Sequence, residues 1–366
     1  SITLTNSELE ALDFLRTETP TKATVIAEGY SVNKINKFSG HFPLLYYEPV
    51  IYESKYPETF FDILNYNTYT IFGFPPRYLW LATEEDFKRY EDSYLFFLLN
   101  YLKPVYKNDE VTILELPNFY PPSPESELAL IKSTSSTPDQ NILMSAIALA
   151  GLSYTIRYDF DLDPPASTLF LTDNVNDDLL NYLVASKAKK LVVFNTDASA
   201  SQFTTLLKIN TSPNKKSING ISGSSMNLSL PSIEIPTFYS LDQDVEPLAY
   251  YTRDGRLISP YAFRKTVANQ EIIYVEIYPY FETLQRNAGT DVGVEIFTKL
   301  GTLINILDLQ LPKCVPPSKP MGRAILFGQT AFEGDVSFNP ASFYIPASEI
   351  KWAQAIGWKE DAFSAG

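Results

Sequence analysis

Cysteine, histidine and methionine are scarce in this chain of 366 residues, which contains one, one and three of them. A single thiol, Cys314, cannot form an internal disulfide, and Cys314 with His41 is too small a set for a zinc site. Scarcity of these side chains is typical of thermophile proteins and of proteins exposed to an acidic or oxidising exterior. Both explanations stay open, and we expect an extracellular protein at the cell surface.

Long apolar runs are also missing. None reaches the ~18 residues that a membrane-spanning helix needs, and the best candidates, Tyr94–Leu102 and Ile142–Leu152, are short and interrupted by polar residues. No signal-peptide pattern is present, and a membrane anchor outside this chain stays open. The formal net charge is −14. We therefore expect no nucleic-acid partner, because a phosphate backbone requires clustered lysine and arginine.

Apolar residues (45%) and aromatic residues (14%) are plentiful, and the length is typical of two or three domains. Proline-rich segments divide the pattern into residues 1–118, 122–312 and 313–366. The first part predicts a small α/β domain, with irregular chain from about residue 30 to Leu64. The last part predicts a short β extension.

The middle part alternates continuous apolar strands with helices, such as Pro138–Ala150 and Val292–Leu307. This alternation predicts an α/β domain with a doubly wound, mostly parallel sheet covered on both faces. Arg253–Arg256 predicts a hairpin turn, because Asp-Gly lies between two strands. Residues 208–230 are rich in serine, asparagine and glycine, and they predict a loop.

Three acidic residues, Asp159, Asp161 and Asp163, alternate directly after a predicted strand. Side chains at this spacing point one way, and their oxygens suit Ca²⁺ or Mg²⁺. Neither the glycine nor the later glutamate of an EF-hand loop is present. A metal site and a solvated strand end both remain open. No motif for a bound cofactor is present, and none is expected.

Nucleophilic chemistry has few candidates. Gly220–Ser224 is similar to a nucleophile elbow around Ser222, but a serine stands in place of the last glycine. Cys314 lies in a proline-rich segment without a helix N-terminus to lower its pKa. Carboxylates are abundant, and a glycosidase needs two of them about 5–10 Å apart. Asn210 and Asn227 each begin an N-glycosylation sequon in the predicted loop.

The segments Ser7–Arg16, Thr24–Ala27 and Phe38–Pro43 resemble the soluble tail of multi-spanning membrane glycosyltransferases of the oligosaccharyltransferase and protein-mannosyltransferase-like group. Strands at Arg77–Leu81 and Leu102–Leu116 would complete that pattern. The resemblance implies a location on the outer face of a membrane. It also implies that catalysis belongs to membrane-side loops outside this chain.

Residues 122–310 resemble the class I glutamine-amidotransferase-like, flavodoxin-like fold, most clearly at Tyr250–Gly255 and Gln270–Pro279. The catalytic elbow of that family is missing, because Asn195-Thr-Asp197 follows the strand Lys190–Phe194 without a cysteine or a glycine-rich turn. The resemblance therefore implies the fold but no catalytic residue.

Together these features predict a non-catalytic cell-surface ectodomain that functions in binding or assembly at the cell envelope. Its partner would be an envelope glycan or a membrane protein. The alternative is an envelope glycosidase or esterase that uses paired carboxylates or Ser222. Two close carboxylates in an aromatic-lined cleft would favour the enzyme.

Overall fold

The chain is divided into two compact units in the computed structural model: Ser1–Phe119 together with Val315–Gly366, and Tyr120–Cys314. The predicted division into three domains stays a prediction beside this arrangement. The structure describes residues 3–20, 23–27, 29–45, 77–82, 94–120, 126–132, 137–158, 166–172, 183, 188–196, 207–240, 244–314, 323–326 and 341–344.

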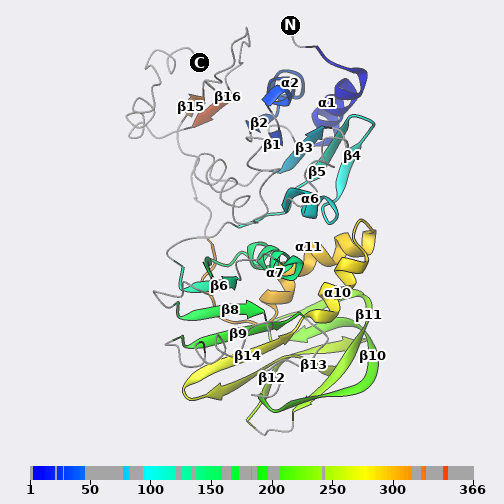
Figure 1. The fold of residues 1–366 in the computed structure, drawn as a ribbon. Helices are drawn as coiled ribbons and strands as arrows, with labels where there is room; N and C mark the ends of the chain where they lie inside the picture. The colour runs from blue at the N-terminus through cyan, green and yellow to red at the C-terminus, as the bar shows by residue number, and fades with distance from the viewer. Residues whose placement is uncertain are drawn as a thin grey trace. The chain divides into compact units, whose positions relative to one another are not determined.

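A five-stranded mixed sheet, in the order β2-β1-β3-β5-β4, forms the centre of the first unit (Figure 1). Helix α1 (Asn6–Glu18) begins at a capping box, in which the Thr5 hydroxyl and the Glu8 carboxylate each accept from the other residue's amide. The other elements are β1 (Thr24–Ala27), α2 (Gly29–Ser39), β2 (Phe42–Leu45), β3 (Tyr78–Ala82), α6 (Tyr94–Leu99), β4 (Pro104–Lys107), β5 (Val111–Glu115), β15 (Arg323–Leu326) and β16 (Ala341–Tyr344).

The expectation of irregular chain after residue 30 is wrong for residues 30–45, which contain most of α2 and all of β2. Val32 and Ile35 lie one helical turn apart on α2, and both are buried in the core that α1 and β1 share. This three-residue spacing is the signal for the helix. The tyrosine-rich and proline-rich sequence that follows obscured it.

Five parallel strands form the centre of the second unit: β6 (Leu128–Lys132), β7 (Thr155–Tyr158), β8 (Thr168–Thr172), β9 (Lys190–Asn195) and β14 (Gln270–Glu276). Their spatial order is β7-β6-β8-β9-β14. Numbered along the chain this is 2-1-3-4-5, the order of flavodoxin-like doubly wound sheets. The expected α/β fold class is confirmed.

Beyond β14 the same sheet continues as an antiparallel extension, which was not predicted. The Asp-Gly hairpin is confirmed: Asp254 and Gly255 have φ of 50° and 77°, the left-handed conformation of a type I′ turn. Ala268 and Asn269, with φ of 48° and 69°, form the turn into β14. The strands of the extension are β10 (Ile209–Gly223), β11 (Asn227–Ser240), β12 (Glu246–Arg253) and β13 (Arg256–Val267).

The prediction of a loop over residues 208–230 is therefore wrong. These residues form β10 and the start of β11, which pair antiparallel around a turn at Ser224–Met226. Ile218, Ile221 and Leu230 are buried beneath polar neighbours that face outward. Pairing between long strands supplies the order that the composition of serine, asparagine and glycine does not suggest.

Three helices, α7 (Pro138–Leu149), α10 (Tyr278–Arg286) and α11 (Asp291–Asn305), lie together on one face of this sheet (Figure 1). The helices predicted at 138–150 and 292–307 are confirmed as α7 and α11. Gly301 allows close packing of these two helices, because an added Cβ would lie 2.4 Å from the Leu149 carbonyl. The opposite face packs against apolar residues that include Leu183, Ala188 and Leu207.

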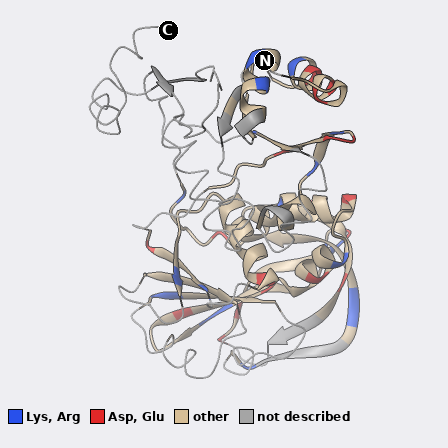
Figure 2. Ribbon diagram, turned by 45° about the horizontal axis from the view of Figure 1, so that its top comes forward, with Lys and Arg blue, Asp and Glu red and all other residues tan. Residues whose placement is uncertain are grey.

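Charged residues occur in small groups along the described ribbon (Figure 2). None of the helices in the described ranges has both the length and the apolar character needed to cross a membrane.

Candidate functional site at the carboxyl edge of the parallel sheet

The direction of strand addition reverses between β6 and β8, because β7 is added on one side of β6 and all later parallel strands on the other. In open α/β sheets, ligands bind outside the carboxyl ends of the strands at such a reversal point. In folds of this class, the loops that leave the strands on either side of such a point run in opposite directions and open a crevice. The carboxyl edge is therefore the part of the sheet where a functional site is most expected.

Four of the five parallel strands end at this edge in buried polar residues. Lys132 ends β6, Thr172 ends β8, Asn195 ends β9 and Glu276 ends β14, with exposed fractions of 1%, 6%, 5% and 1%. Asn195 and Glu276 are register partners on neighbouring strands. A fully buried lysine or glutamate is rare unless it is paired, because burial removes the hydration of the charge.

Glu276 is fixed in position by its neighbours. The Asn195 side-chain amide donates to Glu276 Oε2 at 2.7 Å. The Tyr251 hydroxyl donates to the main-chain oxygen of Glu276. Burial first, and then the charge of Glu276, raises the pKa of the Tyr251 and Tyr261 hydroxyls. Both hydroxyls therefore stay protonated, and each donates its proton to a main-chain oxygen, Tyr251 to that of Glu276 and Tyr261 to that of Leu303.

Lys132 and Glu276 do not form an ion pair with each other. Their strands are three positions apart in the sheet order, which corresponds to roughly 14 Å at the usual strand spacing. Each has further interactions within the structure. The edge thus has a buried ammonium at the reversal point and a buried carboxylate to one side. This arrangement can anchor an anionic or oxygen-rich group at Lys132 and exchange a proton at Glu276.

The predicted metal ligands Asp159, Asp161 and Asp163 follow β7 in the sequence. They lie outside the described residues, so the metal site stays a prediction. Among the residues that the structure does describe, no group of three or more histidine, cysteine, aspartate or glutamate side chains could hold a metal ion.

Ser222 lies on β10, where it pairs with Asn227 and Tyr250, and not in a strand-to-helix elbow. The chain's one histidine belongs to the other unit. Its ring nitrogens contact the Ser39 carbonyl at 3.1 Å and the Thr19 hydroxyl at 2.7 Å, and burial lowers its pKa. His41 thus joins the end of α1 to the end of α2, which is a structural role.

The two sequons are in strands and not in a loop. Asn210 is the second residue of β10, and Asn227 is the first residue of β11 and is exposed. Glycosylation at either residue stays a prediction. Cys314 is half-buried, and this burial raises its pKa. Its thiol contacts the Leu152 carbonyl at 3.6 Å, an environment that disfavours the reactive thiolate.

Sequence reasoning missed Lys132, Asn195 and Glu276. A signal was present, because each is the polar last residue of an otherwise apolar strand: Leu-Ala-Leu-Ile-Lys132, Leu-Val-Val-Phe-Asn195 and Ile-Ile-Tyr-Val-Glu276. A polar strand end is common, however, and is usually solvated. Only the sheet order shows that the three residues share one edge.

No family model and no curated protein matches this chain. Solved structures resemble it weakly. They include a β-galactosidase from Bacillus circulans sp. alkalophilus (TM-score 0.35, 13% identity, 55% of this chain and 33% of that chain). Another is the exo-β-1,4-mannosidase Op5Man5 from Opitutaceae bacterium strain TAV5 (0.33, 11%, 51% and 36%). A third is the carbohydrate deacetylase Agd3 (0.32, 10%, 47% and 32%).

The match spans about a third of the length of each of these proteins. All three are enzymes that act on carbohydrates by the names they carry. The expectation of a non-catalytic ectodomain is corrected on this finding, and the enzyme alternative agrees with it better. Likeness at these TM-scores assigns no activity to this chain, so its activity has to be argued from the site.

Proposed function

We propose that the Tyr120–Cys314 unit is a hydrolytic enzyme for an extended polar substrate, with its site at the carboxyl edge. The observation that carries the proposal is the burial of two opposite charges, Lys132 and Glu276, at the edge where doubly wound sheets bind ligands. Burial removes the hydration of both charges. Charged groups whose surroundings are perturbed in this way are concentrated at functional sites.

In this proposal Glu276 transfers a proton to or from the substrate, and Asn195 positions its carboxyl group through the 2.7 Å hydrogen bond. Lys132 binds the oxygen-rich part of the substrate through charge-assisted hydrogen bonds. Glycosides are the first substrate class to test, since abundant carboxylates led to the glycosidase alternative. A glycosidase uses two carboxylates, and Glu276 supplies one of them.

The test is a panel of nitrophenyl glycosides and nitrophenyl acetate with the full chain. Glu276→Gln is expected to lower kcat at least about 100-fold, the usual contribution of a general acid–base group. Lys132→Met is expected to raise KM about tenfold through loss of one charge-assisted contact. Two controls lie at the amino edge of the same sheet: Glu271→Gln on β14 and Lys190→Met on β9.

Both controls are expected to leave kcat and KM unchanged. The proposal is wrong if Glu276→Gln retains full activity while folded, or if the full chain hydrolyses no member of the panel. Location outside the cytosol, an envelope glycan or membrane protein as partner, and kinship with membrane glycosyltransferases remain proposals from the sequence.

A further inference from the structure

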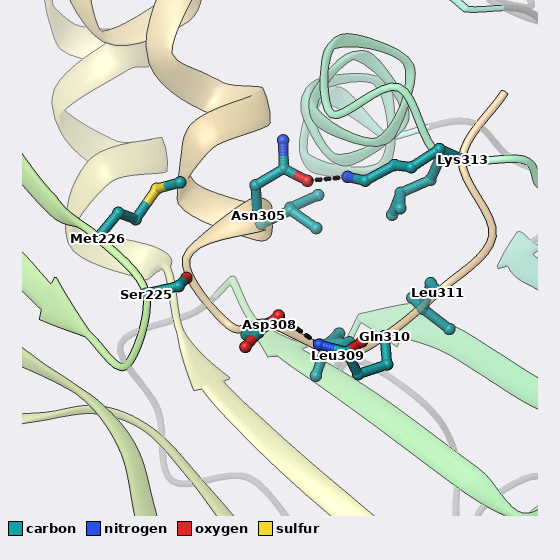
Figure 3. A pocket seen from close by; sticks show the side chains of 10 residues that line it. Ser225, Met226, Asn305, Asp308, Leu309, Gln310, Leu311 and Lys313 are labelled. Atoms are coloured by element: carbon teal, nitrogen blue, oxygen red, sulfur yellow. Dashed lines mark hydrogen bonds between the residues drawn. The ribbon is translucent and has the colours of Figure 1, made fainter. Parts of the chain in front are cut away.

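A cavity lies at the opposite, amino edge of the parallel sheet (Figure 3). The segment 308–313 borders it and runs along the starts of the strands: Lys190, the first residue of β9, donates to the Leu309 carbonyl at 3.2 Å. The Ser153 amide, just before β7, donates to the Pro312 carbonyl at 2.9 Å. The cavity is therefore separate from the carboxyl edge.

Close backbone packing forms this cavity. It lies where α7 and α11 end and where the chain turns between β10 and β11, and its volume is 460 Å³, within the range of small-molecule sites. Gly223 brings β10 against the Ile306 carbonyl, since an added Cβ there would lie 2.5 Å from that oxygen. The lining residues are Leu152, Ser225, Met226, Ile304, Asn305, Asp308, Leu309, Gln310, Leu311 and Lys313.

Opposite charges lie on facing sides of the cavity. In Figure 3 the Lys313–Asn305 pair is on one side and the Asp308–Gln310 pair on the other. Lys313 Nζ donates to the Ala150 carbonyl at 3.0 Å and to Asn305 Oδ1. An ammonium has three donors, so these two bonds leave one for a ligand. The Asp308 carboxylate accepts from Gln310 at 2.6 Å and retains lone pairs.

The segment that contains Asp308 has a strained backbone conformation. Asp308 and Gln310 have φ of 49° and 53°, a left-handed conformation that costs a non-glycine residue free energy and is concentrated at binding and catalytic sites. Between them Leu309 is 8% exposed. Successive side chains of this segment therefore alternate: Leu309 is buried, and the Asp308 carboxylate and the Gln310 amide lie at the cavity.

We propose that this cavity binds a free α-amino acid with an apolar side chain. The ligand carboxylate would bind Lys313, and its ammonium would bind Asp308. Its side chain would lie against the apolar lining, which Met226 and Leu311 represent in Figure 3. Each ion of the ligand then meets an opposite charge, and the cavity buries the apolar part.

The experiment is calorimetric titration of the full chain with L-leucine, leucinamide and N-acetyl-leucine. Leucine is expected to bind at least about tenfold more tightly than either analogue, because each analogue lacks one of the two ions. Asp308→Asn is expected to weaken leucine binding about tenfold. Lys313→Gln should do the same. Because Lys313 also supports the end of α7, Asp308→Asn at an exposed residue keeps the test valid if Lys313→Gln is unstable.

The matched controls are Asp254→Asn, in the β12–β13 turn, and Lys299→Gln, which is paired with Glu295 on α11. Both should leave leucine affinity unchanged. Equal affinity for leucine and its analogues, tighter binding of the dipeptide alanyl-leucine, or no binding of leucine at about 10 mM, which is far weaker than typical small-molecule sites, would each overturn the proposal. The result is independent of hydrolysis at the carboxyl edge.

Discussion

Glu271 and Glu276 lie on the same strand, at opposite edges of the same sheet, in very different surroundings. The Glu271 side chain is 30% exposed and contacts Lys190 at 3.3 Å and Arg264 at 3.8 Å. Glu276 is 1% exposed and accepts from the neutral amide of Asn195. The lysines differ in the same way. The Lys190 side chain is 24% exposed, whereas only 1% of the whole Lys132 residue is exposed.

The comparison distinguishes charged side chains that water partly solvates from charged side chains that the fold buries. Exposed ion pairs such as Arg264–Glu246, at 2.9 Å, contribute little to stability, because water already solvates both ions. A buried carboxylate has lost that solvation and depends on its hydrogen bonds. The amino edge therefore has partly exposed ion pairs, whereas the carboxyl edge has buried charges, which suit a functional role.

The largest expected effect tests the packing of the amino edge. Gly301→Val would place a branched side chain against the Leu149 and Ala150 backbone, where an added Cβ already lies within 2.6 Å. We expect a loss of about 3 kcal/mol in the free energy of unfolding, as for severe overpacking. Urea denaturation measures it. Thr298→Val, an exposed site on the same helix, is the control, and equal losses in the two variants would refute the packing explanation.

A smaller effect is expected when the two glutamates are each replaced by alanine. Glu276→Ala removes the carboxylate that accepts the 2.7 Å bond from the buried Asn195 amide, and we expect it to lower the free energy of unfolding by about 2 kcal/mol. Glu271→Ala removes a partly exposed ion-pair partner and should cost about 0.5 kcal/mol. The measurement is urea denaturation at low and high salt. Salt should reduce only the Glu271 effect, and a salt-sensitive Glu276 effect would break the comparison.

The smallest effect concerns the turn that enters β14 at the amino edge. Ala268 has φ of 48°, which glycine adopts without a Cβ penalty. Ala268→Gly is expected to raise the free energy of unfolding by about 0.5 kcal/mol, after subtraction of the entropy that glycine loses. Thermal unfolding measures it, with Ala262→Gly within β13 as a destabilising control. A less stable Ala268→Gly would show that the turn is not strained.

The sequence was sufficient to predict α7, α11, the parallel strands β7, β8, β9 and β14, and the Asp254-Gly255 hairpin, because each depends on local pattern and turn chemistry. It did not predict β6. It was misleading for residues 208–230, where Ile218, Ile221 and Leu230 are widely spaced among polar residues. Pairing over a long hairpin gave those residues a strand conformation, and pairing partners are not visible in local composition.

The sequence by itself determined most of the apolar strands, the helices α7 and α11 and the Asp-Gly hairpin. Only the tertiary structure decided that Lys132, Asn195 and Glu276 share one buried edge, and that Asp308 and Lys313 face each other across a cavity. The physical reason is that strand order and burial arise from contacts between segments far apart in the chain. A charge at a strand end is solvated or buried according to those contacts, and its residue type does not reveal which.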